Sequence, residues 1–174
     1  MKISDLKNKI KNIKLIVLDV DGVLTNGKIN MDSKGEEIKV FDVQDGYGLV
    51  LFKKAGFKTA ILSARSAAAV TARAHDLKID KVYQDAYPKI NAYNCLLRDF
   101  QLTDEEVCFI GDDLPDLAVL RRVGLAVGVP NAVKEVHEVA HYVTQNAGGA
   151  GAVREVVELI LKTQGKWEEI LQSL

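Results

Sequence analysis

The sequence predicts an α/β fold in which helices cover both faces of a mostly parallel sheet. Short apolar runs rich in β-branched residues alternate along the chain with segments of helical length, which is the pattern of such a sheet. The chain has 174 residues, of which 48% are apolar, and this length is typical of one domain. We therefore expect residues 1–174 to form a single domain with a sizeable core.

The first predicted element is a buried strand at residues 14–18, which precedes a segment that breaks the alternation. In that segment, residues 28–31 and 36–43 flank the turn-forming stretch Asp-Ser-Lys-Gly at 32–35, which is typical of a β-hairpin. The hairpin region, about 27–43, is too short to bury a core. It is predicted to be an appendage of the main domain.

The remaining elements follow in regular alternation. Further strands are expected at residues 58–62, 81–83, 107–110 and 125–127, with a short edge strand at 142–143. Helices are expected at residues 48–55, 67–75, 89–100, 116–123, 132–140 and 152–162. Gly56 suits a left-handed position after the first of these helices. Residues 164–174, with Trp167 among charged residues, are predicted to form a tail that docks elsewhere.

Composition excludes several classes of partner. Lys plus Arg number 23 and Asp plus Glu number 24, for a net charge of −1, so neither nucleic acid nor an anionic membrane surface is the expected partner. No apolar run approaches the roughly 20 residues that a membrane span requires, and the first residues lack an export signal. The two cysteines have no metal-site spacing, which favours reduced thiols in a cytoplasmic protein.

Polar residues stand directly after the predicted strands. Asp19 and Asp21 follow the first strand with Gly22 behind them, and Ser63-Ala64-Arg65 follows the strand at 58–62. The strand at 107–110 leads into Gly-Asp-Asp-Leu-Pro-Asp, residues 111–116, and Lys89 opens the helix after the third strand of the sheet. Ligands of open α/β sheets bind at the carboxyl ends of the strands. These residues are therefore predicted to form one site.

The converging carboxylates indicate a metal ion. Clustered acids repel each other unless a cation neutralises them, and an all-oxygen set without Cys or His favours Mg²⁺, which binds carboxylates together with a substrate phosphate. Ser63 and Lys89, with backbone N–H groups around Gly22 and Ala64, would donate to the phosphoryl oxygens. The sequence thus predicts a phosphoryl-transfer site.

These motifs resemble those of the haloacid dehalogenase (HAD) superfamily of phosphohydrolases: Asp-x-Asp-Gly, a Ser/Thr, a Lys and Gly-Asp-Asp-x-x-Asp occur here in order. DVDGVLTNG, FDVQDGYGL, GDDLPDL and GGAGAVREV are also similar to segments of its capless (C0) family of 3-deoxy-D-manno-octulosonate 8-phosphate phosphatases. The resemblance extends from about residue 13 to 167. It implies a Rossmann-like three-layer sandwich without a cap domain, and hydrolysis of that sugar phosphate in lipopolysaccharide precursor synthesis.

The resemblance also implies residue roles. Asp19 would be the nucleophile that forms an aspartyl-phosphate, and Asp21 the general acid and then the base. Mg²⁺ would be held by Asp19, the Asp21 carbonyl and Asp112, with Asp113 or Asp116 behind them. Ser63 and Lys89 would stabilise the transferred phosphoryl group.

Arg65 is the candidate for binding a substrate carboxylate, because a guanidinium can hold one bidentately. Since similar phosphatases form tetramers through their hairpins, we also expect a homotetramer in which the apolar hairpin at 27–43 contacts other copies.

Two alternatives remain open. One is a phosphatase for a related keto-acid sugar phosphate, such as a sialic-acid-type 9-phosphate. The other is a phospho-accepting receiver domain, also α/β with an acidic Mg²⁺ pocket. In receivers the acceptor Asp follows the third strand, whereas here Gly-Asp-Asp-x-x-Asp follows the fourth main strand, which favours the hydrolase.

Overall fold

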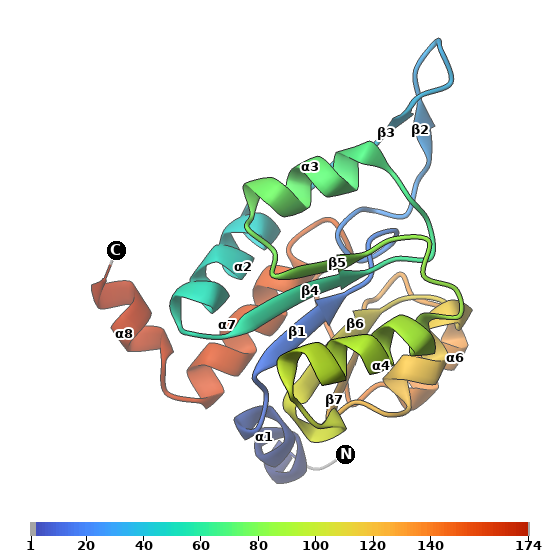
Figure 1. The fold of residues 1–174 in the computed structure, drawn as a ribbon. Helices are drawn as coiled ribbons and strands as arrows, with labels where there is room; N and C mark the ends of the chain where they lie inside the picture. Colours follow the sequence, from blue (N-terminus) through green and yellow to red (C-terminus); the bar gives the residue numbers. More distant parts are fainter. Residues whose placement is uncertain (1–2, 174) are drawn as a thin grey trace.

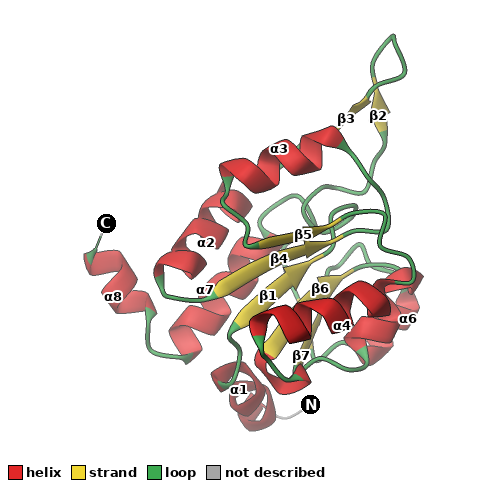
Figure 2. Cartoon of the chain, in the orientation of Figure 1, coloured by secondary structure: helices red, strands yellow, loops and turns green. Residues whose placement is uncertain are grey.

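The computed structural model of the chain describes residues 3–173, which form a three-layer α/β sandwich with a projecting hairpin (Figures 1 and 2). The strands are β1 (Leu15–Leu18), β2 (Asn30–Met31), β3 (Glu37–Ile38), β4 (Lys58–Leu62), β5 (Lys81–Tyr83), β6 (Val107–Gly111), β7 (Leu125–Gly128) and β8 (Tyr142–Val143). The α-helices are α1 (Ile3–Lys11), α2 (Val43–Lys54), α3 (Ala68–Asp76), α4 (Lys89–Phe100), α5 (Leu117–Leu120), α6 (Lys134–Val139), α7 (Ala152–Thr163) and α8 (Trp167–Gln172). Two 3-10 helices, η1 (Asp104–Glu106) and η2 (Leu114–Asp116), flank β6.

The main sheet has six strands in the order β5-β4-β1-β6-β7-β8, and every neighbouring pair is parallel. β1 lies at its centre, hydrogen-bonded to β4 on one side and β6 on the other. The predicted fold class is confirmed. This order places the chain segments that follow β1, β4 and β6 next to one another at one edge of the sheet.

Helices cover both faces of the sheet because the central strands are apolar on both sides. Along β1, Ile16 and Leu18 face a core shared with α1, α2 and α7, whereas Leu15 and Val17 face a core shared with α4, α5 and α6. All four β1 side chains are buried. A continuous apolar run of this kind is typical of a parallel strand between two helical layers.

Helix α2 is longer than the sequence predicts, beginning at Val43 rather than at residue 48. Asp42 caps it by accepting hydrogen bonds from the N–H groups of Gln44 and Asp45. The prediction assigned residue 43 to the hairpin and began the helix at Gly48, so it missed this turn. In the structure a Cβ at Gly48 would lie 3.2 Å from the Cα of Arg154, so the glycine allows α2 and α7 to pack closely.

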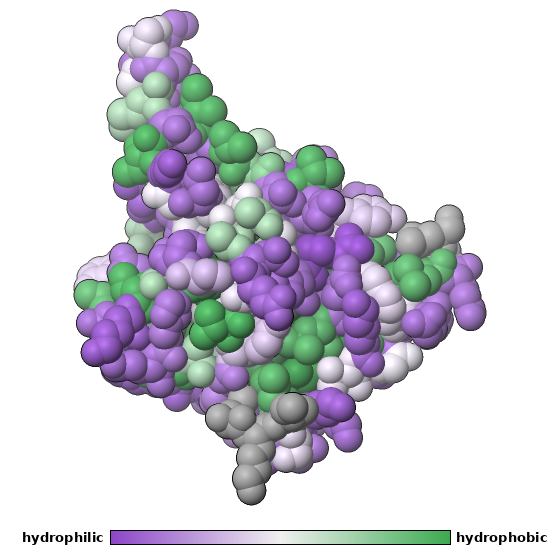
Figure 3. Space-filling model, turned by 180° about the vertical axis from the view of Figure 1, so that it is seen from behind, coloured by the Kyte–Doolittle hydropathy of each residue, from purple (hydrophilic) through white to green (hydrophobic). Residues whose placement is uncertain are grey.

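The predicted hairpin is present and projects beyond the sheet, but its strands are only two residues each (Figure 1). Asp32 Oδ1 closes the turn by accepting from the N–H groups of Lys34 and Glu36. We call residues 27–43 the arm. Hydrophobic side chains are visible along it in the rear view (Figure 3). The exposed apolar residues of the arm are Ile29, Met31, Ile38, Val40 and, at the start of α2, Val43.

Two terminal helices, α1 and α8, were not predicted from the sequence. Helix α1 contributes Ile10 to the core but is otherwise largely polar, which hid it. The predicted tail contains α8, which packs on α7 through the buried Ile170. Figure 1 shows α8 at the opposite end of the sheet from the arm. The tail therefore docks away from the carboxyl ends of the strands. No helix among residues 3–173 is long and apolar enough to cross a membrane.

Candidate active site

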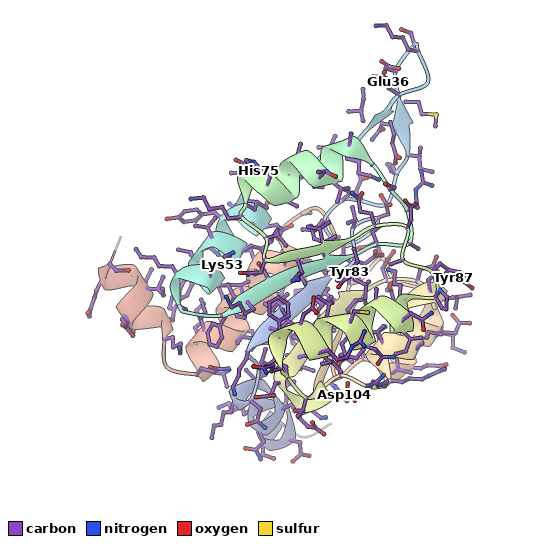
Figure 4. The ribbon with its side chains drawn as sticks, viewed as in Figure 1. Glu36, Lys53, His75, Tyr83, Tyr87 and Asp104 are labelled. Atoms are coloured by element: carbon purple, nitrogen blue, oxygen red, sulfur yellow. The ribbon has the colours of Figure 1, made fainter. Side chains whose placement is uncertain are left out.

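The carboxyl ends of β1, β4 and β6 meet around one cavity of about 310 Å³. Figure 4 shows Tyr87, just ahead of α4, at this edge of the sheet, and Glu36 far out on the arm. The residues that line the cavity are Asp19, Asp21, Gly27, Ser63, Ala64, Arg65, Lys89, Asp112, Asp113, Pro115 and Asp116. All the candidate side chains named from the sequence except Gly22 are in this set, although they span almost a hundred residues of the chain.

Lys89 joins two of the acidic motifs. Its ammonium Nζ lies 2.7 Å from Asp19 Oδ1 and 2.6 Å from Asp116 Oδ1, and its side chain is only 2% exposed. It is the first residue of α4, so the helix start directs it to the end of β1. A buried lysine requires such partners, because an unpaired charge in the interior is strongly unfavourable.

Three carboxylates offer a site for a cation. Oxygen atoms of Asp19, Asp112 and Asp116 all lie within 4.8 Å of one another. Asp112 Oδ1 is buried and, in the part of the chain that the structure describes, has no hydrogen-bond partner. A buried carboxylate oxygen without a donor is costly, and a hard divalent cation is the kind of ligand that would satisfy it. The residues present thus fit a Mg²⁺ ion.

The pKa values of these acids reflect the same crowding. Burial, followed by repulsion from Asp116, raises the pKa of Asp19 to about 6, although Lys89 opposes this shift. Burial, followed by repulsion from Asp19 and Asp116, raises the pKa of Asp112 to about 8. Both raised pKa values mean that the charged forms are disfavoured, as expected when three buried or partly buried carboxylates share a single lysine.

Asp116 is held by the turn that contains it. Its Oδ2 accepts hydrogen bonds from the N–H groups of Asp112, at 2.9 Å, and Asp113, at 3.3 Å. Asp113 caps η2 and its side chain is exposed at the cavity rim. A Cβ at Gly111 would lie 2.6 Å from Asp116 Oδ2. The Gly-Asp-Asp-x-x-Asp motif is therefore a compact turn that presents Asp112 while Asp116 supports both Asp112 and Lys89.

Ser63 is buried at the end of β4, and its Oγ accepts a hydrogen bond from the Arg65 N–H at 3.2 Å. That bond leaves the hydroxyl hydrogen of Ser63 available for another acceptor. Ala64 also lines the cavity. This turn therefore offers one hydroxyl donor beside the carboxylate cluster.

Gly22 has a different place from the one predicted. Its N–H points to Thr25 Oγ1 at 3.4 Å rather than serving as a donor at the cavity wall. Its φ is +93°, and a Cβ would lie 2.0 Å from Asp112 Oδ2. The glycine is needed because it permits this backbone conformation and leaves room for Asp112.

Asp21 contacts a lysine that the sequence analysis did not identify. Lys39, just after β3, places its Nζ 2.5 Å from Asp21 Oδ1 and 2.8 Å from Glu37 Oε1. Arg65 lies on the other side, with Nε 3.8 Å from Asp21 Oδ2 and Nη2 3.1 Å from Glu37 Oε2. No spacing in the sequence pointed to Lys39 and Glu37, because charged residues in a hairpin usually face solvent.

Asn131 was also missed. Its Nδ2 donates to the Gly22 carbonyl and its Oδ1 accepts from the Gly148 N–H, at 2.9 and 2.8 Å. Gly149 N–H donates to the Val23 carbonyl at 2.9 Å. The glycine-rich segment before α7 thus packs behind the turn that carries Asp19 and Asp21.

Comparison with known proteins agrees with this geometry. Residues 78–156 match the model of a haloacid dehalogenase-like hydrolase family. The chain is 43% identical to the 3-deoxy-D-manno-octulosonate 8-phosphate phosphatase KdsC of Escherichia coli, over 95% of this chain and 88% of that protein.

Two solved structures extend the similarity to the fold. The phosphatase of the same name from Moraxella catarrhalis, solved with magnesium, phosphate and KDO, is 40% identical with a TM-score of 0.96 and coverage of 99% of both chains. A probable YrbI family phosphatase from Pseudomonas syringae is 45% identical with a TM-score of 0.95, covering 98% of this chain and 97% of that one. The chain therefore belongs to the haloacid dehalogenase-like hydrolases, within the family of 3-deoxy-D-manno-octulosonate 8-phosphate phosphatases.

Proposed function

We propose that this protein is a Mg²⁺-dependent phosphatase that hydrolyses 3-deoxy-D-manno-octulosonate 8-phosphate. The observation that carries the proposal is the juxtaposition of Asp19, Asp112 and Asp116 with the buried Lys89 at the sheet edge. The similar Moraxella phosphatase, solved with magnesium, phosphate and KDO, supports the choice of metal and sugar.

Asp19 is the proposed nucleophile. One of its carboxylate oxygens attacks phosphorus, the bond from phosphorus to the sugar oxygen breaks, and an aspartyl-phosphate forms. Lys89 Nζ lies 2.7 Å from Asp19 Oδ1, and this contact orients the carboxylate. Water then attacks the aspartyl-phosphate, which releases inorganic phosphate and regenerates Asp19.

Asp21 is the proposed general acid and base. It donates a proton to the departing sugar oxygen and later accepts one from the attacking water. Its side chain lines the same cavity as Asp19, two residues away. Because the two acids follow one strand, Asp19 can reach the phosphorus atom while Asp21 reaches the oxygen that bridges it to the sugar.

Mg²⁺ would be held by Asp19, the backbone carbonyl of Asp21 and Asp112, and when bound it neutralises charge among the acids and on the phosphoryl group. Ser63 donates its free hydroxyl hydrogen to a phosphoryl oxygen. Lys89 contributes positive charge beside the nucleophile.

Arg65 is the proposed ligand of the substrate carboxylate. Its side chain is 49% exposed at the cavity rim, so it is accessible, but Glu37 already contacts it at 3.1 Å. A substrate carboxylate must therefore share the guanidinium with Glu37. The Ala64 N–H at the same turn is a further candidate donor to the substrate.

The arm is the proposed assembly surface of a homotetramer. Ile29, Met31, Ile38 and Val40 are 56%, 63%, 51% and 65% exposed, which leaves the apolar side of the arm without a partner in one chain. Apolar surface of this kind is typical of interfaces. The double substitution Ile38→Asp and Val40→Asp should give smaller assemblies by light scattering, whereas Lys34→Asp at the exposed arm tip should not.

The two thiols are free, Cys108 buried and Cys95 partly buried, which suits the reducing cytoplasm that we propose as the location.

A substrate panel tests the proposed function. Phosphate release should require Mg²⁺ and should be most efficient with 3-deoxy-D-manno-octulosonate 8-phosphate, compared with a sialic-acid-type 9-phosphate and simple hexose phosphates. Asp19→Asn should abolish turnover. Preference for the nine-carbon substrate would reassign the sugar, and absence of turnover with every phosphomonoester would contradict the phosphatase assignment.

A further inference from the structure

The arm has an inverted pattern of burial at its base. Ile38 and Val40 are 51% and 65% exposed, whereas the charged side chain between them, Lys39, is only 3% exposed. Alternate side chains of an extended segment face opposite sides. The arm therefore turns its apolar side chains outward and directs its lysine toward the active site.

Lys39 belongs to a set of four charged side chains that balance one another. Its Nζ bridges Asp21 Oδ1, at 2.5 Å, and Glu37 Oε1, at 2.8 Å. Glu37 Oε2 in turn lies 3.1 Å from the Arg65 guanidinium. Two cations thus face two carboxylates, so that Lys39 can be buried without an uncompensated charge.

The two oxygens of Asp21 are held differently. Oδ1 accepts the hydrogen bond from Lys39. Arg65 Nε lies 3.8 Å from Oδ2, which is beyond hydrogen-bond length. Lys39 therefore fixes one oxygen, and Oδ2 is left as the atom that a substrate can approach.

We propose that Lys39 is a positioning residue that fixes Asp21 so that Oδ2 exchanges protons with the sugar oxygen and with water. This inference rests on the proposed phosphatase function. In the first step the Oδ2 proton passes to the bridging oxygen as its bond to phosphorus breaks, and the bonding electrons remain on that oxygen. Because the arm carries Lys39, the arm also helps to order the catalytic acid.

The experiment compares two leaving groups in the full-length protein with Mg²⁺. A sugar phosphate has a poor leaving group that needs protonation, whereas p-nitrophenolate departs without it, so a defect in the acid appears in kcat/KM for the first substrate only. Lys39→Met should lower kcat/KM about 10- to 100-fold for 3-deoxy-D-manno-octulosonate 8-phosphate, since misplacement by about 1 Å can lower a rate about 100-fold. For p-nitrophenyl phosphate the change should stay within about threefold.

Lys34→Met at the exposed arm tip is the matched control and should resemble the wild type with both substrates. Glu37→Gln, which loosens Lys39 but keeps the lysine, should give a smaller selective loss. For Lys39→Met the loss should fall on kcat, with KM for the sugar phosphate within about twofold of the wild-type value. For Glu37→Gln the loss is read from kcat alone, because Glu37 also contacts Arg65. A thermal melt identifies any variant that fails to fold, and Glu37→Gln then serves as the test.

For Lys39→Met, three results would overturn the role of Lys39: an equal loss of kcat/KM with both substrates, a change confined to KM, or unchanged kinetics. These outcomes are distinct from failure of the proposed function, in which the wild-type protein itself does not hydrolyse the sugar phosphate.

Discussion

Without metal ions, the protein should lose stability as the pH rises from about 4 to 8. The ordinary pKa of an aspartate is 3.8, and in the folded protein the pKa rises to about 6 for Asp19 and about 8 for Asp112. Between these limits the folded state binds more protons than the unfolded state. Stability therefore falls with pH, because its slope follows the protons bound in the unfolded state minus those bound in the folded state.

The size of the effect follows from the shifts. For the buried Asp19 the pKa rises from 3.8 to about 6, which corresponds to about 3 kcal/mol at about 1.4 kcal/mol per pKa unit. This loss is complete near pH 6. Asp112 adds a loss of the same sign that continues to about pH 8, since its pKa is the higher of the two.

Urea unfolding in EDTA from pH 4.5 to 8.5 measures the loss, and Asp112→Asn is the matched control. The asparagine amide of this variant resembles the protonated acid. The free energy of unfolding of the variant should therefore stop falling near pH 6, while that of the wild type continues to fall. Groups common to both proteins, such as His141, whose pKa burial lowers, cancel in the difference. Mg²⁺ at 100 times its Kd should restore about 2.7 kcal/mol to the wild type at pH 8.

Parallel curves for the two proteins, or equal stabilisation of both by Mg²⁺, would refute the reasoning. The first result would mean that Asp112 ionises normally in the folded state. The second would mean that its oxygens do not hold the ion.

Three further substitutions follow from the site geometry. Lys89→Met leaves Asp19 and Asp116 without their shared cation, and should lower the free energy of unfolding by about 3–5 kcal/mol in urea and abolish phosphate release. Gly22→Ala places a Cβ 2.0 Å from Asp112 Oδ2, so calorimetry should show weakened Mg²⁺ binding; unchanged affinity would contradict the assigned packing. Asn131→Ala removes bonds to the Gly22 carbonyl and the Gly148 N–H, and thermal or urea unfolding should report a loss of about 1–3 kcal/mol.

Local signals in the sequence were sufficient for the strands. The central strands are continuous apolar runs, and the predicted boundaries agree with β1 and β4 to within a residue. Helix α2 was predicted to begin at Gly48, one turn late; in the structure that glycine allows close packing against α7, whereas Gly46 in the missed turn faces Arg73. Helices α1 and α8 were missed because each is short and mostly polar, with one buried residue, Ile10 or Ile170, among its described side chains.

The sequence by itself determined the acids, the serine and the lysine that follow the strands, because parallel strands bring their carboxyl ends to one edge of the sheet. Only the tertiary structure decided that Asp116 supports Lys89, that Gly22 makes room for Asp112, and that Lys39 reaches Asp21. These contacts join residues that are far apart in the sequence, so the periodicity of helices or strands does not reveal them. Their strength also depends on burial, which excludes water from charged pairs and which no local pattern of residues specifies.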